Sequence, residues 1–115
     1  MKKATVFLFL IALFFSCGTK KNINVLHYFP PTNIKIDVMG AGQTVPNNLI
    51  LIGNISIEDT GITSAKNCTY SKVVKEAILL AQQMGGNILY IVTHHVPDSN
   101  STCHRINVNV YRFKE

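Results

Sequence analysis

The sequence predicts an α+β domain in which one helix packs on a small, mostly antiparallel sheet, in the order strand, strand, strand, helix, strand, strand. Only the stretch 69–84 carries apolar residues at spacings of three and four, the period of an amphipathic helix. Two later stretches, 87–96 and 104–113, are apolar or alternate between apolar and polar residues, as strands do. Cys68 and Cys103 are expected to join the domain by one disulfide.

The first sixteen residues have the order of a lipoprotein signal peptide. Two early lysines precede an apolar run from Val6 to Phe15, and Ser16 and Cys17 follow. A run of about ten residues is half of what a membrane-spanning helix needs, so we expect a cleaved signal over 1–16. The stretch Phe14-Phe15-Ser16-Cys17 resembles a lipobox, which implies that Cys17 carries lipid. An ordinary cleaved signal with an incidental cysteine is the alternative.

The rest of the chain is predicted to be a lipidated tether over 17–22 and a single extracytoplasmic domain over 23–115. Lipid chains on Cys17 would hold this domain on a membrane without a spanning helix. Gly18 after the cysteine fits sorting to the outer membrane as enterobacteria practise it, with the domain facing the periplasm. After residue 16, nine Lys and Arg residues stand against six Asp and Glu residues, and they are scattered. This mild charge excludes nucleic acid as an expected partner and leaves the membrane and an envelope protein.

Three strands are expected before the helix. Ile23 to Phe29 forms the first and ends at two prolines, which cannot donate ladder hydrogen bonds. Ile34 to Val38 alternates between apolar and polar residues and forms the second. Leu49 to Ile57 is the most apolar strand, and its odd-numbered positions are expected to share one face. The glycine-rich and asparagine-rich stretch 39–48 is read as a loop.

The helix and the final hairpin have clear boundaries in the sequence. Thr69 or Ser71 is the expected N-cap, because a hydroxyl there satisfies an early backbone N–H group. Gly85 and the glycine after it end the helix, since glycine takes the left-handed turn without steric cost. The polar stretch 97–102 is a hairpin loop between the last two strands.

The disulfide prediction comes from counting cysteines. If Cys17 carries lipid, Cys68 and Cys103 remain, in a compartment where disulfides persist. Their bond would close a loop of 36 residues, and the chain-entropy estimate of its stabilisation is roughly 3–4 kcal/mol. For so small a domain this is a large share of the total stability.

The stretch from Leu51 to Phe113 resembles the RcsF family, outer-membrane lipoproteins that sense envelope stress for the Rcs phosphorelay. The shared order is the strand Leu51-Ile52-Gly53-Asn54-Ile55-Ser56, Cys68 before a helix, Met84-Gly85-Gly86-Asn87 at its end, an apolar strand, and Cys103-His104-Arg105. The resemblance implies the same fold, a disulfide from Cys68 to Cys103, and a sensing role at the outer membrane. The family's proline-rich linker, which is understood to contact outer-membrane partners, is absent here.

The resemblance also implies a neighbouring pair. The family's second disulfide would fall at His94 and Asn109, and neither residue is cysteine in this chain. We therefore expect these two side chains to lie opposite each other on adjacent antiparallel strands, close enough for a polar contact.

Other chemistry has little support in the sequence. His94 and His95 could join Cys103 and His104 around a metal, but adjacent strand residues point to opposite faces, so no metal site is expected. Catalytic residues are also not expected, because the disulfide removes the thiols and neither paired acids nor a phosphate-binding glycine motif is present. We expect no cofactor. The chain is interpreted as a non-enzymatic sensing or binding module, and the alternative is a structural accessory subunit of an envelope or secretion complex.

Overall fold

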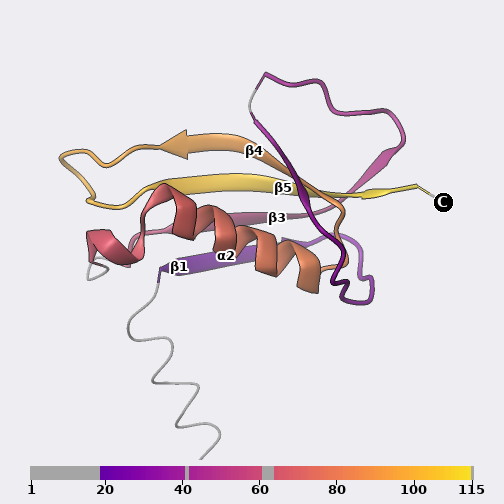
Figure 1. The fold of residues 1–115 in the computed structure, drawn as a ribbon, viewed down its shortest axis with the longest axis horizontal. Coiled ribbons are helices and arrows are strands. Elements are labelled where there is room, and N and C mark those ends of the chain that lie inside the picture. The colour runs from indigo at the N-terminus through magenta and orange to yellow at the C-terminus, as the bar shows by residue number, and fades with distance from the viewer. Residues whose placement is uncertain (1–18, 41, 61–63, 115) are drawn as a thin grey trace, which may run out of the picture.

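The computed structural model describes residues 19–40, 42–60 and 64–114, and it confirms the predicted α+β class with one α-helix and one disulfide (Figure 1). The elements are, in chain order, β1 (Lys20–Val25), β2 (Asp37–Met39), β3 (Leu49–Glu58), the short 3₁₀ helix η1 (Ala65–Asn67), α2 (Tyr70–Gln83), β4 (Ile88–His95) and β5 (Arg105–Phe113).

The five strands form one mixed sheet in the order β1-β3-β5-β4-β2. All neighbours are antiparallel except β2 and β4, which are parallel. The order across the sheet therefore differs from the succession of the strands along the chain. The two earliest strands form the two edges, and the final hairpin lies inside the sheet beside β3. α2 crosses one face of this sheet (Figure 1).

A single residue defines each end of α2. The Thr69 hydroxyl accepts a hydrogen bond from the Lys72 N–H group at 3.3 Å, so Thr69 is the N-cap of the two candidates. Past the other end, Gly85 has φ +82°, and a Cβ there would lie 2.6 Å from the Pro30 carbonyl oxygen. Both the left-handed backbone and this close approach require glycine.

The hydrophobic core lies between α2 and the face of the sheet that it covers. The side chains that are fully buried there are Ile52, Ile55, Ile57, Leu89, Val108 and Val110 from the strands and Val73, Ala77 and Ala81 from α2. The two alanines carry no long side chain, so the helix approaches the strands closely. Burial of these apolar surfaces is the main stabilising term of the fold.

A β-bulge in β3 changes which of its side chains reach the core. Leu51 lies opposite Tyr111, whereas Gly53 lies opposite Val110, so Ile52 is an extra residue. An extra residue reverses the alternation of side chains between faces. The prediction of a single apolar face for this strand is therefore wrong. Leu49 and Leu51 lie on the uncovered face, whereas Ile55 lies on the face that α2 covers. Neither a bulge nor its position is visible in a continuous apolar run.

The first strand begins earlier than predicted. β1 covers Lys20–Val25 instead of Ile23 to Phe29, so the tether expected over 17–22 is wrong for residues 20–22, which pair with β3. β1 ends where β3 bulges, because the N–H groups of the next two residues both donate to the Ile52 carbonyl. Residues 20–22 are two lysines and an asparagine, so no apolar residue marks the start of this edge strand in the sequence.

The second strand begins later than predicted, at Asp37. The segment before it crosses the end of α2, where the Thr32 N–H group donates to the Gln82 carbonyl at 2.8 Å. The Gln82 side chain in turn donates to the Ile34 carbonyl at 3.1 Å. These backbone groups bond to the helix end instead of to a strand, and Ile36 enters the core beside them. Of the alternating apolar residues, only Ile36 is buried, while Ile34 and Val38 are exposed.

Candidate functional site

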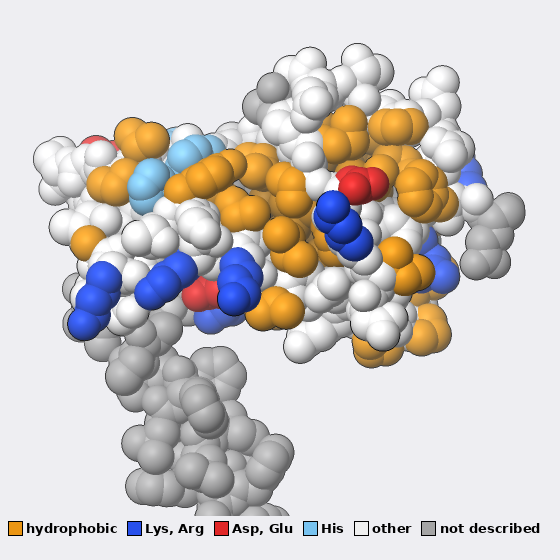
Figure 2. All heavy atoms as spheres, viewed as in Figure 1, with side chains coloured by type: hydrophobic (Ala, Val, Ile, Leu, Met, Phe, Trp, Pro, Cys, Tyr) orange, Lys and Arg blue, Asp and Glu red, His pale blue; other side chains and the backbone are white. Residues whose placement is uncertain are grey.

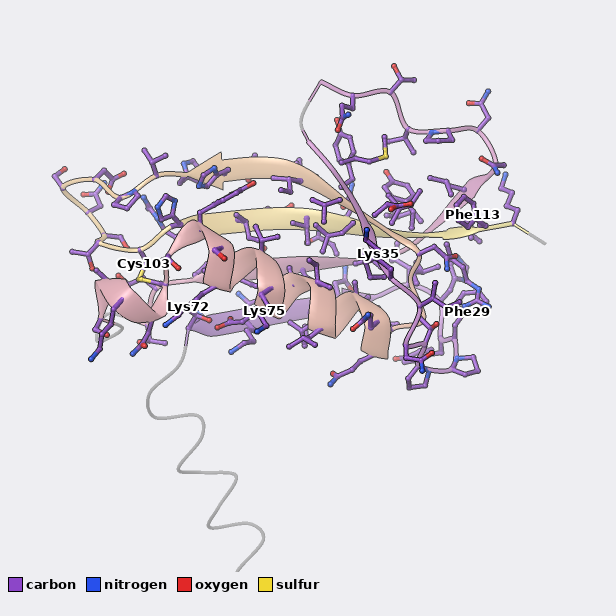
Figure 3. All side chains as sticks on the ribbon, in the orientation of Figure 1. Phe29, Lys35, Lys72, Lys75, Cys103 and Phe113 are labelled. Atoms are coloured by element: carbon purple, nitrogen blue, oxygen red, sulfur yellow. A yellow bond between two sulfur atoms is a disulfide. The ribbon has the colours of Figure 1, made fainter. Side chains whose placement is uncertain are left out.

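Cys68 and Cys103 form the predicted disulfide, with their Cα atoms 5.1 Å apart. Cys68 follows η1 and precedes α2, and Cys103 precedes β5, so the bond ties the start of the helix to the start of a central strand. Both side chains are fully buried in the core. The His104 N–H group also donates to the Cys68 carbonyl at 3.1 Å. Neither thiol is available as a nucleophile or a metal ligand. Figure 3 labels Cys103 at this end of the molecule.

His94 and His104 meet beside this disulfide. Nε2 of His94 lies 2.8 Å from Nδ1 of His104, and the Tyr70 ring centroid lies 4.3 Å from that of His94. A neutral imidazole has one donor and one acceptor nitrogen, so one of the two facing nitrogens carries a proton that the other accepts. The sequence singled out both histidines as candidate metal ligands. It did not predict the contact with Tyr70, because this contact depends on the position of the helix on the sheet.

The surroundings of His94 favour its neutral form. The pKa of His94 lies below its ordinary value of 6.5, first because partial burial removes water from the charged ring. The nearby positive charge of His104, and then that of His95, lowers the pKa of His94 further. The lowered pKa therefore favours the neutral ring of His94 near neutral pH.

The hairpin loop fixes how β4 and β5 pair. The Asp98 carboxylate accepts hydrogen bonds from the N–H groups of Asn100 and Ser101 and from the Arg105 guanidinium, at 2.9, 3.1 and 2.9 Å. The Arg105 bond, more than the others, holds the pKa of Asp98 below its usual value. With the loop closed in this way, pairing begins with His95 opposite Arg105.

This register separates His94 from Asn109, so the predicted pair is wrong. His94 lies opposite Ile106, and Asn109 lies opposite Tyr90. The expected pairing would require a shift of three residues, and an odd shift moves a side chain to the other face of the sheet. His94 lies on the face covered by α2, and Asn109 lies on the uncovered face. This part of the resemblance to the RcsF family loses its support.

Four side chains on the uncovered face form a connected network, which we call the asparagine network: Asn54, Ser56, Asn107 and Asn109. The Asn54 amide nitrogen donates to the side-chain oxygens of Asn107 and Asn109 at 3.0 and 2.9 Å. The Asn107 amide nitrogen donates back to Asn54 at 3.2 Å and to Ser56 at 2.6 Å. Mutual hydrogen bonds restrict the rotamers of these half-buried side chains.

The asparagine network lies in the middle of a wider polar band. By register, Asn24 of β1 lies opposite Asn54, while Tyr90 and Thr93 of β4 lie opposite Asn109 and Asn107. A depression of about 160 Å³ opens beside it, with Ser56, Glu58, Thr93, His95, Arg105 and Asn107 among its lining residues. The band crosses four strands. The sequence signal that could have identified it is asparagine itself, which is depleted in strands yet recurs in β3 and β5.

The chemistry available at these two places is recognition by hydrogen bonding. Amide and hydroxyl groups offer both donors and acceptors without a net charge. Among residues 19–40, 42–60 and 64–114, no three His, Cys, Asp or Glu side chains lie close enough together to hold a metal ion. The expectations that the chain uses no metal, no cofactor and no catalytic residue stay predictions.

The predicted signal over 1–16 and the predicted lipid site Cys17 lie outside the described residues. Within the described ranges, no helix is long and apolar enough to cross a membrane. Lipid attachment at Cys17 therefore stays a prediction.

Comparisons with known proteins give no assignment. No protein-family model matches the chain, and neither the curated proteins nor the solved structures contain a significant match. The resemblance to the RcsF family stays an expectation from short motifs.

Proposed function

We propose that the chain is a membrane-anchored, non-enzymatic binding or sensing module of the bacterial envelope, held by lipid on Cys17. The observation that carries this proposal is the asparagine network on the uncovered face. Hydrogen bonds among Asn54, Asn107 and Asn109 position polar groups before any partner arrives, and such preorganisation lowers the entropic cost of binding.

Two further features support an envelope location. The order of charge, apolar run and cysteine up to Cys17 is that of an exported lipoprotein. A buried disulfide such as the one between Cys68 and Cys103 is typical of the oxidising compartments outside the cytoplasm, to which such a signal directs a protein. The partners that follow are the membrane itself and one envelope protein, and the proposed location is the outer membrane, with the domain facing the periplasm.

The anchor is tested by the Cys17→Ser variant. We expect the parent protein to incorporate labelled fatty acid and to sediment with membranes, and the variant to do neither. An unchanged fatty-acid label in the variant would exclude lipid attachment at this position.

The binding face is tested by photocrosslinking in intact cells. A photoreactive residue at Thr93 beside the asparagine network should give a defined crosslinked species, whereas one at Gln83 at the end of α2 should not. A product that changes in amount under envelope stress supports a sensing module. A product at constant stoichiometry would support the accessory-subunit alternative. Equal crosslinking from both positions would contradict the assignment of the face.

A further inference from the structure

Lysine side chains gather along one edge of the molecule. We call this group the lysine edge, and it consists of Lys20, Lys21, Lys66, Lys72 and Lys75, all of them exposed. Figure 2 shows basic side chains along the lower left edge, over α2, and Figure 3 labels Lys72 and Lys75 on the side of α2 toward β1. Spacing by three residues places Lys72 and Lys75 on one flank of the helix.

One acidic residue links the lysines at the start of β1 to the lysines of α2. The Glu76 carboxylate on α2 accepts a hydrogen bond from the Thr19 hydroxyl at 2.6 Å and lies 3.6 Å from the Lys21 ammonium. This contact fixes the start of β1 against the helix. Among the described residues, Lys72 and Lys75 form no ion pair. Lys72 and Lys75 therefore carry positive charge that no ion pair with a described residue neutralises.

The lysine edge lies next to the predicted lipid site. Thr19 is buried against α2 and follows Cys17 by two residues, and two residues span at most about 7 Å. That length is shorter than the Debye length of about 8 Å at physiological ionic strength. The lysines nearest Thr19 would therefore sense the charge of a bilayer that holds Cys17.

We propose that the lysine edge docks on anionic lipid headgroups of the membrane in which Cys17 is anchored. The proposal rests on the proposed lipid anchor. Each lysine near an anionic membrane surface contributes about 1 kcal/mol, or roughly a fivefold increase in membrane partitioning. A depression of about 330 Å³ opens at the same edge, with Lys20 and Lys21 among its lining residues, and ammonium groups suit phosphate oxygens.

Docking in this way sets the orientation of the domain. β1 is an edge strand, so it would lie nearest the bilayer, and the β4 and β2 edge would point away from it. The sheet then stands on its edge. The asparagine network faces sideways and stays open to the periplasm instead of being pressed against lipid.

The experiment that tests docking is lysine footprinting of the lipidated full chain on vesicles. With phosphatidylglycerol present, Lys72 and Lys75 should be protected from an amine-reactive ester, while Lys35 and Lys114 stay reactive. In phosphatidylcholine alone, all four should react. Equal reactivity in both lipids, with the protein anchored, would overturn the docking proposal.

A second measurement separates docking from anchoring. The unlipidated Cys17→Ser chain should float with phosphatidylglycerol vesicles at low salt, and K72E with K75E should lower this binding at least about 25-fold. The matched control, K35E with K114E, makes the same change in net charge and should have little effect. Absence of fatty-acid labelling in the parent protein would refute the anchor alone, whereas equal vesicle binding by the two double variants would refute the docking alone.

Discussion

The two faces of the sheet are built from the same strands and use opposite physical principles. Adjacent residues show the contrast: Val108 is fully buried under α2, while Asn107 faces away and bonds to Asn54 and Ser56. The covered face gains its stability from burial of apolar area and from a disulfide, and the uncovered face gains local order from hydrogen bonds. Stability and the proposed recognition therefore depend on different faces and should respond to different substitutions.

The largest expected effect is on the covered face. Replacing Cys68 and Cys103 together with alanine should lower the free energy of unfolding by about 3–4 kcal/mol, because the closed loop no longer restricts the unfolded chain. Urea denaturation of the oxidised protein and the variant measures this difference. An unchanged midpoint would mean that the disulfide adds nothing and that burial alone supports this face.

A matched pair of substitutions compares the two faces within β3. Ile55→Ala should cost about 3 kcal/mol because it leaves a cavity under α2, whereas Asn54→Ala should cost about 1 kcal/mol because its hydrogen bonds are replaced by bonds to water. The same denaturation experiment measures both. If Asn54→Ala is as costly as Ile55→Ala, the asparagine network is part of the core in energetic terms.

The smallest expected effect is the pH dependence from His94. Its pKa is lowered in the folded protein, so the unfolded chain binds a proton first as the pH falls. The stability contribution is complete above the ordinary value of 6.5, decreases as the pH falls through it, and levels off below the lowered folded-state pKa. Unfolding measured across this range should show the slope in the parent protein and in His95→Gln. In His94→Gln the slope should be reduced, and an unchanged slope there would assign it to other groups.

Features encoded within a short window could be predicted from the sequence. The helix is marked by its period, by Thr69 and by Gly85, and the disulfide follows from the number of cysteines in a chain that is expected to be exported. The α+β class follows from these local features together. Cys17 and its lipid depend on a local motif as well, but they lie outside the described residues.

Features that depend on contacts between strands could not be predicted. The extra residue at Ile52 looks like any other member of an apolar run, yet it reverses the faces of β3. The pairing expected between His94 and Asn109 was wrong by three residues, because the loop closed by Asp98 sets the register. The meeting of His94 with Tyr70 requires the position of the helix on the sheet, which no local pattern contains.

The contact of Thr19 with Glu76 has a mechanical consequence if the proposed lipid anchor holds the protein at Cys17. When a bound partner moves away from the membrane, the pulling force enters the fold at the start of β1. The Glu76 contacts and then the ladder between β1 and β3 would carry this load one pair after another, from Lys20 and Glu58 toward Val25 and Gly53. The stretch from Cys68 to Cys103 meets this path only through the Glu76 contacts, and it is closed by a covalent bond. Under tension, β1 can peel away as an extensible spacer while the helix and the final hairpin stay folded.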